Sequence, residues 1–201
     1  MMLSKEKTYE QLRAESDRSI PEAKKIISKF LFENIEPTTV YDDMTKCIDL
    51  VFEARKVVFA HRCRKDNGRP IDDVTIKTGS MYGEQTWSGK QILVEFDKLI
   101  NYDFANVTDM YYFYCQFNYD LNKITKYIIY DLKKLSLNES FKKRELFIYS
   151  EDKINKVDGG SKFNAISVKT LRDLGLVIIE YPMKVESMKY VQNSTYVELP
   201  F

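Results

Sequence analysis

The chain has 201 residues, of which 44% are hydrophobic and 30% are charged, a composition typical of a folded globular protein rather than a disordered chain. The formal net charge of +1 excludes a chain that is basic throughout, so any binding of nucleic acid would depend on local basic patches. A single histidine excludes a metal site built from several histidines, and three cysteines are too few for a disulfide framework.

The order of apolar and turn-forming segments predicts one α+β domain over residues 1–201, with a mainly antiparallel central sheet flanked by helices. Residues 15–135 are its expected core, and residues 136–201 are a C-terminal extension with one helix and one strand. No signal peptide and no apolar run of about 18 residues is present. We therefore expect a cytoplasmic protein that has no contact with a membrane.

The first predicted element is a helix over about residues 20–33. Ser19 or Asp17 is suited to cap its amino end, and Pro21 is suited to its first turn. One face of this helix is apolar and is expected to pack on the sheet, through Ile20, Ala23, Ile26, Ile27, Phe30 and Leu31.

Three short apolar runs follow and predict an antiparallel meander at the centre of the molecule. The strands are expected at residues 47–52, 56–64 and 73–77. Side chains alternate along the second strand, so His61 and Cys63 face one side of the sheet, and Arg62 and Arg64 face the other.

The loop at residues 79–89 contains three glycines and is interpreted either as a functional loop or as a surface insertion. A helix is expected over about residues 91–100. The aromatic run at residues 109–117 is apolar on both faces and predicts a central strand, with an antiparallel partner at 124–131.

Five further elements are predicted after this hairpin. They are a short helix from about residue 131, irregular or edge structure over 136–160, a connector at 161–167, a helix over 168–175 closed by Gly175, and a buried strand at 176–181.

Asp49 is a carboxylate in an apolar strand, a position that costs free energy unless the group binds or pairs with a cation. One interpretation is a cross-strand ion pair with Arg62 or Arg64 that stabilises the sheet. The other is a ligand to Mg²⁺, helped by Asp42 or Asp43, because the divalent metals that hydrolyse nucleic acids take oxygen ligands.

An amino-terminal helix, a strand with Asp49 and a hairpin strand with charged residues about a dozen positions later resemble the core of the PD-(D/E)xK nuclease superfamily. The resemblance implies that Asp49 is the strand aspartate, that Arg62-Cys63-Arg64 occupies the place of the acid-x-Lys pair, and that Glu15 or Asp17 is the helix acid. Arg62 cannot bind a metal. The missing carboxylate would come from Glu95 or Asp73, or the fold would serve as a non-catalytic phosphate binder.

A second set of motifs is scattered over roughly residues 10–135. It comprises Ser16 to Pro21, the Asp49 strand, Arg62-x-Arg64, Thr75-Ile76-Lys77, Glu95-x-x-Lys98 and Asp109-x-x-x-Phe113-Tyr114. This set is similar to a family of uncharacterised proteins from phages and mobile elements. The similarity implies a phage protein that works in the cytoplasm of the host cell.

Five basic residues are expected to converge if the meander forms, namely Arg62, Arg64, Lys65, Arg69 and Lys77. Arginine side chains bind phosphate with two parallel hydrogen bonds, so one interpretation is a phosphate-binding surface, with Tyr82, Trp87 or Tyr112 available to stack on a base. The other interpretation is a solvated charged face.

His61 is interpreted either as a general base or, from its place opposite Arg62, as a partly buried core residue. Cys63 and Cys115 have no evident catalytic partner in the sequence, and both are interpreted as packing residues.

Two functions are predicted from these residues. The first is a divergent metal-dependent nuclease or phosphodiesterase that uses Mg²⁺, with Asp49, Asp43 and Glu95 as metal ligands and with Arg62, Arg64 and Lys77 on the scissile phosphate. The second is a non-catalytic protein of the same fold that binds nucleic acid, a nucleotide or a host protein, as an anti-defence protein would. A structural role in a virion is a third possibility, and it predicts an exposed apolar patch without a basic cleft.

Overall fold

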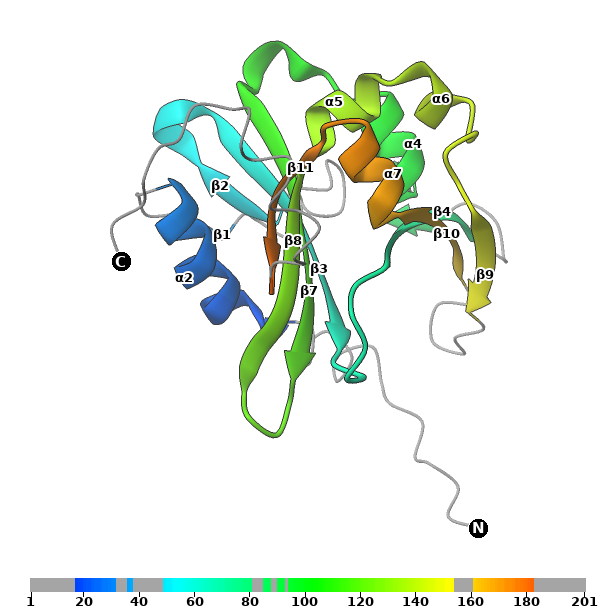
Figure 1. Cartoon of the computed structure of the whole chain (residues 1–201). Coiled ribbons are helices and arrows are strands. Elements are labelled where there is room, and N and C mark those ends of the chain that lie inside the picture. The colour runs from blue at the N-terminus through cyan, green and yellow to red at the C-terminus, as the bar shows by residue number, and fades with distance from the viewer. Residues whose placement is uncertain are drawn as a thin grey trace.

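The computed structural model of the chain describes residues 17–31, 36–37, 49–80, 85–87, 90–92, 94–153 and 161–182. These residues form an α+β structure in which a mixed sheet is flanked by helices (Figure 1). The large sheet has the strand order β1, β2, β3, β7, β8, β11. Its strands are β1 (Glu36–Pro37), β2 (Leu50–Phe52), β3 (Val57–Lys65), β7 (Asp109–Asn118), β8 (Lys123–Asp131) and β11 (Val177–Tyr181).

The two central strands, β3 and β7, are parallel. Their register runs without a break from Val57 opposite Asp109 to Lys65 opposite Phe117. The flanking pairs β2–β3, β7–β8 and β8–β11 are antiparallel. The α+β class is therefore confirmed, whereas the prediction of a mainly antiparallel sheet is not confirmed, because its central pair is parallel.

The predicted meander is wrong in its third strand. β4 (Asp73–Ser80) leaves the large sheet and pairs with β10 (Ser161–Ser167), which in turn pairs with β9 (Tyr149–Lys153). Residues 161–167, which the sequence predicts as a connector, are thus the central strand of a second sheet. The edge of β3 that β4 was expected to occupy is taken by β7, because the long aromatic β7 buries more apolar surface there than the short run at 73–77 can.

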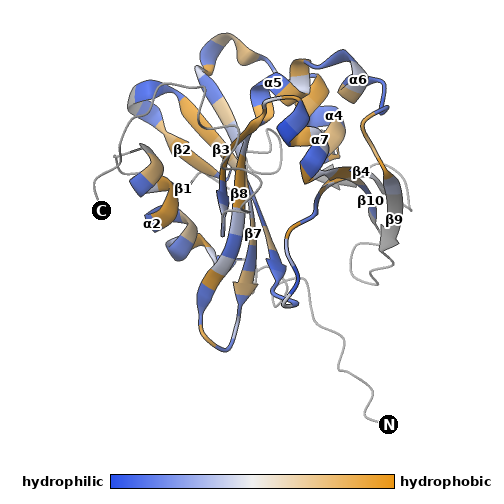
Figure 2. Cartoon of the chain, viewed as in Figure 1, coloured by the Kyte–Doolittle hydropathy of each residue, from blue (hydrophilic) through white to orange (hydrophobic). Residues whose placement is uncertain are grey.

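Each face of the central strands has its own hydrophobic core. On one face, α2 (Ile20–Leu31) covers the sheet and buries Ala23 and Ile27 against Phe59 and Phe113, which confirms the predicted helix. On the other face, Tyr112 belongs to a larger core that includes side chains of the second sheet and of the helices beside it. Those helices are α4 (Glu95–Ile100), α5 (Leu132–Leu137), α6 (Glu139–Lys142) and α7 (Val168–Asp173). Figure 2 shows hydrophobic residues in the middle of the central strands and hydrophilic residues near the lower ends of β3 and β8.

The shorter elements connect these layers. A short hairpin of β5 (Gln85–Trp87) and β6 (Lys90–Ile92) lies within the segment that the sequence predicts as a loop and the start of a helix. Two 3-10 turns are η1 (Glu53–Arg55) and η2 (Phe104–Asn106). Among the described residues, no helix combines the length and the apolar character that crossing a membrane requires.

Candidate functional site

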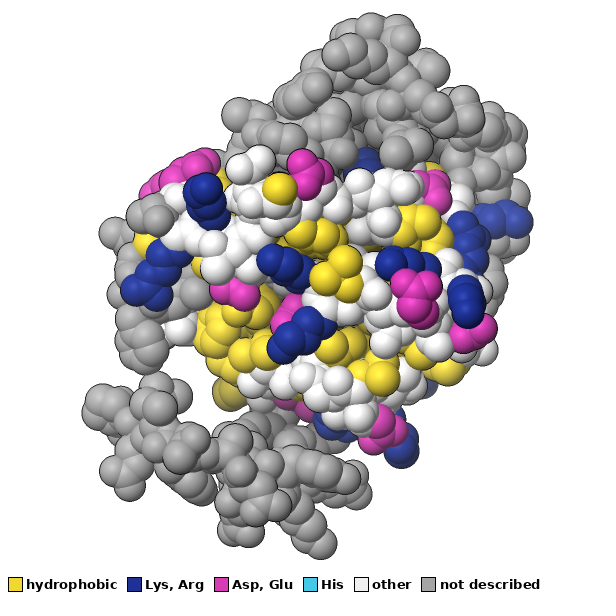
Figure 3. Space-filling view, turned by 90° about the horizontal axis from the view of Figure 1, so that it is seen from above, with side chains coloured by type: hydrophobic (Ala, Val, Ile, Leu, Met, Phe, Trp, Pro, Cys, Tyr) yellow, Lys and Arg dark blue, Asp and Glu magenta, His cyan; other side chains and the backbone are white. Residues whose placement is uncertain are grey.

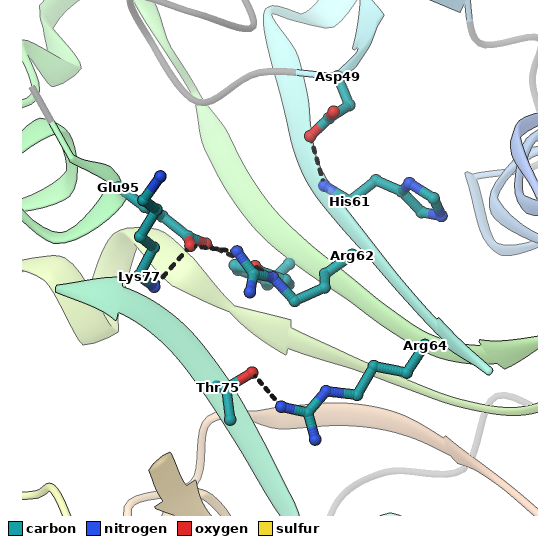
Figure 4. A network of polar contacts seen from close by, with 8 residues as sticks. Asp49, His61, Arg62, Arg64, Thr75, Lys77 and Glu95 are labelled. Atoms are coloured by element: carbon teal, nitrogen blue, oxygen red, sulfur yellow. Dashed lines mark hydrogen bonds and ion pairs between the residues drawn. The ribbon is translucent and has the colours of Figure 1, made fainter. Parts of the chain in front are cut away.

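Strand β3 presents different side chains on its two faces, as the alternation of side chains along a strand predicts (Figure 4). The ring of His61 points to the side of α2, while Arg62 and Arg64 point toward β4 of the second sheet. The region where β3 and β4 face each other, lined by Arg62, Arg64, Thr75 and Lys77, is called the inter-sheet seam below. It brings together three of the predicted basic residues through a packing of two sheets rather than through a meander.

Asp49 lies directly before β2 and extends the ladder between β2 and β3. Its backbone N–H donates to the carbonyl of Phe59 at 2.8 Å, and its Oδ2 accepts from the backbone N–H of His61 at 2.6 Å (Figure 4). The side chain is half-buried. Arg62 contacts Glu95, Tyr112 and Phe163 instead of Asp49, so the predicted ion pair between Asp49 and Arg62 is not formed.

Replacing Asp49 by alanine should lower the free energy of unfolding by about 1–3 kcal/mol, because the half-buried amide of His61 loses its acceptor. Asp49→Asn keeps an acceptor oxygen and should cost less than Asp49→Ala. Urea unfolding of the three proteins measures both differences. Equal stability of all three would show that this hydrogen bond does not contribute to folding.

The carboxylate of Glu95, which lies beside the seam, accepts hydrogen bonds from three residues. Its Oε2 accepts from Arg62 Nη2 at 2.6 Å and from the backbone N–H of Lys77 at 2.8 Å, and its Oε1 accepts from the hydroxyl of Tyr112 at 2.5 Å. Arg62 Nε also donates to the Tyr112 hydroxyl at 3.1 Å. The side chains of Arg62 and Glu95 are 23% and 8% exposed, so this ion pair is largely removed from water. The network links β3, β4, α4 and β7.

The environment of Arg62 strengthens its positive charge. Burial alone would lower the pKa of the guanidinium, but the Glu95 carboxylate and the Tyr112 hydroxyl outweigh it, so the net pKa is raised above its ordinary value. The guanidinium also lies over the ring of Phe163 from β10, with Cζ 4.8 Å from the centroid. Arg62 is therefore charged at any pH at which the protein is folded, and it is held in one position.

Arg64 is the second cation of the seam. Its Nη2 donates to the hydroxyl of Thr75 on β4 at 2.8 Å, and its Cζ lies 5.7 Å from the ring centroid of Tyr114. Alternation along β4 places Lys77 on the same face as Thr75. Lys77 is partly exposed, and so is Arg64. Three cations from two sheets thus lie along the seam: Arg62 pairs with Glu95, Arg64 bonds Thr75, and Lys77 bonds Glu95 through its backbone N–H.

The other two predicted basic residues, Lys65 and Arg69, follow Arg64 in the chain. Lys65 is exposed at the end of β3, and Arg69 is exposed in the turn after it. In the same turn, Asp66 accepts from Lys126 and Thr125, and the bond from Lys126 is the main reason that its pKa falls to about 2. The predicted metal ligand Asp43 and the side chain of Trp87 lie outside the described residues.

On the side of the large sheet that faces α2, His61 contacts side chains whose proximity the sequence did not predict. Its Nε2 is 3.2 Å from Ser19 Oγ and 3.7 Å from Cys115 Sγ, and its ring stacks on Phe113 at 5.8 Å. Burial, with a smaller contribution from Arg62, lowers the pKa of His61 from 6.5 to about 4. His61 is therefore neutral at pH 7, and its interpretation as a partly buried core residue fits these contacts.

Two partners of the basic residues, Thr75 and Phe163, were not predicted as members of the site, and Tyr112 was predicted to stack on a base rather than to bond Arg62 and Glu95. Their positions depend on the pairing of β3 with β7 and of β4 with β10, and no local pattern in the sequence reports either pairing. Within the described ranges, no group of three or more His, Cys, Asp or Glu side chains is arranged to hold a metal ion. Asp49, Glu95 and Asp73 were predicted to supply carboxylates to a metal, and each accepts a hydrogen bond from the protein.

The chain matches none of the known protein-family models, and comparison with curated proteins and with solved structures gives no significant match.

Proposed function

We propose that this protein binds nucleic acid by its phosphate groups at the inter-sheet seam, and that it acts by binding rather than by cleavage. The observation that carries the proposal is the gathering of Arg62, Arg64 and Lys77 on β3 and β4, where Arg62 is held by Glu95 and Arg64 by Thr75. A cluster of cations in a partly buried region favours an anionic ligand.

The geometry of the arginines supports a phosphate ligand. Each guanidinium lies over an aromatic ring and donates to a defined oxygen, so little side-chain entropy would be lost when it binds. A guanidinium has five N–H donors in a planar arrangement. Phosphate oxygens accept such donors in pairs.

The charge distribution elsewhere also favours a local site. Figure 3, which views the molecule from above, shows Lys and Arg interspersed with Asp and Glu on that face. With a net charge of +1, the chain offers no general attraction for a polyanion. Binding would therefore depend on a small number of phosphate contacts.

The arrangement of carboxylates argues for binding rather than metal-dependent cleavage. A metal ion at Glu95 would have to displace Arg62, the Lys77 amide or the Tyr112 hydroxyl, and it would meet the charge of Arg62 at close range. Asp49 would likewise have to release the His61 amide if its Oδ2 were to bind a metal. The predicted Mg²⁺-dependent nuclease requires both changes.

Arg64→Gln is the variant that tests the binding site. Glutamine keeps a donor for Thr75 but removes the charge, so we expect the affinity for labelled DNA or RNA to fall about tenfold and the salt dependence to weaken by about one phosphate contact. Fluorescence anisotropy at several salt concentrations, with single- and double-stranded probes, measures both quantities. Lys169→Gln removes one exposed charge from α7 and should leave both unchanged.

The same samples test the alternative. Cleavage that needs Mg²⁺ or Mn²⁺, stops with EDTA and is lost in Asp49→Asn would replace the binding proposal by the nuclease. Absence of binding to every probe at low salt, with the protein folded, would overturn both.

A further inference from the structure

Cys63 and Cys115 lie opposite each other on the two central strands. They are Cα partners in the parallel ladder of β3 and β7, and both side chains belong to the core covered by α2. Neighbouring strands are about 4.8 Å apart, and disulfides join Cα atoms about 4.4–6.8 Å apart. The backbone therefore already has the spacing that a disulfide needs.

The two thiols have different environments. Cys115 is fully buried, whereas Cys63 is partly exposed at the outer part of β3. The Cys63 sulfur has hydrogen-bond contacts with Cys115, Ser19 and Tyr119, and these contacts, that with Cys115 first, hold the pKa of Cys63 below its usual value. Burial raises the pKa of Cys115. Cys63 is therefore both the more accessible thiol and the one with more thiolate character.

A neutral imidazole lies beside the buried thiol. The Nε2 of His61 is 3.7 Å from Cys115 Sγ, and His61 is neutral at pH 7 because its pKa is about 4. The imidazole also contacts Ser19 Oγ, so the Cys115 thiol is held by a polar group although it is buried.

We propose that Cys63 and Cys115 are a peroxide-reactive pair that forms a reversible disulfide between β3 and β7. The Cys63 thiolate attacks hydrogen peroxide, the O–O bond breaks, and Cys63 becomes a sulfenic acid as hydroxide leaves and takes up a proton to form water. The Cys115 thiol then attacks the Cys63 sulfur, the S–S bond forms, the S–O bond breaks, and the hydroxyl group leaves with the Cys115 thiol proton as a second water. Peroxide is reduced while the two thiols are oxidised, and a dithiol reductant reverses the reaction by exchange.

The experiment uses the full chain with Cys47→Ser, which removes the third cysteine, a residue outside the described ranges. The folded protein is treated with hydrogen peroxide, alkylated, digested and analysed by mass spectrometry. We expect a linked peptide pair that contains Cys63 and Cys115, complete loss of the two titratable thiols, and recovery of both with dithiothreitol.

Two further variants, each made in the Cys47→Ser background, establish which thiol reacts with peroxide first. In Cys47→Ser/Cys115→Ala, Cys63 should accumulate as a sulfenic acid that dimedone labels, because the resolving thiol is absent. In Cys47→Ser/Cys63→Ala, Cys115 should stay reduced at the same peroxide concentration. Circular dichroism confirms that each variant is folded.

The result in Cys47→Ser decides the proposal without relying on the other variants. It is overturned if both thiols of the folded protein stay reduced at peroxide concentrations that oxidise free cysteine. It is also overturned if Cys63 is oxidised to a sulfinic acid while Cys115 stays reduced, since the two thiols would then react separately.

Discussion

Replacing Arg62 by methionine should lower the free energy of unfolding by about 3–5 kcal/mol, because the carboxylate of Glu95 would remain buried without its cation. Methionine retains most of the apolar stem of arginine, so the loss reports the charge rather than the packing. Urea unfolding of the wild type and Arg62→Met at pH 7 measures the difference. A loss below about 1 kcal/mol would indicate that water already reaches Glu95 and that Arg62 is available to a ligand.

A double variant separates the ion pair from the rest of the network. Glu95→Gln removes the charge but keeps an acceptor for the Tyr112 hydroxyl or the Lys77 amide. Arg62→Met combined with Glu95→Gln should therefore recover a large part of the stability that Arg62→Met loses. Lys24→Met is the control from an exposed pair, since its partner Glu36 is 71% exposed, and it should cost no more than about 1 kcal/mol.

This prediction also limits how the site can be tested. If Arg62 holds the seam together, a loss of nucleic-acid binding in an Arg62 variant would report unfolding as much as a lost contact. Arg64 donates to the neutral hydroxyl of Thr75, so an Arg64 variant tests binding while Arg62 stays paired with Glu95. The stability of Arg62→Met and the affinity of Arg64→Gln together separate the structural and binding roles of the two arginines.

The stability of the protein should fall by up to about 3 kcal/mol as the pH is lowered from 6.5 to about 4, through His61 alone. The folded pKa is about 4 and the ordinary value is 6.5, so in this window the unfolded chain binds a proton that the folded chain does not. Lowering the pH stabilises the state that binds more protons, which here is the unfolded state. Burial is the main cause, and the charge of Arg62 adds to it.

Urea unfolding at intervals from pH 7.5 down to the acid limit measures this slope. His61→Gln cannot titrate and should be less stable by a constant amount, with a much flatter slope between pH 6.5 and 4. Asp66→Asn is the control, because the pKa of Asp66 is lowered from 3.8 to about 2 and its contribution is lost only in that more acidic range. The same slope in the wild type and His61→Gln would show that His61 titrates normally in the folded protein.

Local patterns in the sequence were sufficient for several elements of the fold. The apolar stripe of α2 predicted its buried face, because spacing along a helix depends only on the helix itself. The hairpin of β7 and β8 followed from two apolar runs and the turn between them. In this turn, Asn118 Oδ1 accepts from the backbone N–H groups of Asp120 and Leu121, and Asn122 has a positive φ of 48°. Gly175, at a φ of 65°, ends α7 with the expected hydrogen bonds back to the last turn.

Strand partners were decided by tertiary structure, because pairing is a competition between segments far apart in the chain. β4 was expected beside β3, but β7 took that edge and β4 joined β10. A short amphipathic strand such as 161–167 does not reveal its partner, and an exposed connector has the same residue types.

In the candidate site, too, some features follow from the local sequence and others depend on tertiary structure. Alternation along β3 was enough to place His61 and Cys63 on one face and Arg62 and Arg64 on the other, since side chains of any strand alternate. The partners were decided only by tertiary structure: packing of α4 and β4 against β3 brought Glu95 to Arg62 and Thr75 to Arg64, and pairing of β3 with β7 brought Cys115 to Cys63. Each of these contacts joins residues more than ten positions apart, so their free energies depend on the whole packed structure and on no local segment of the sequence.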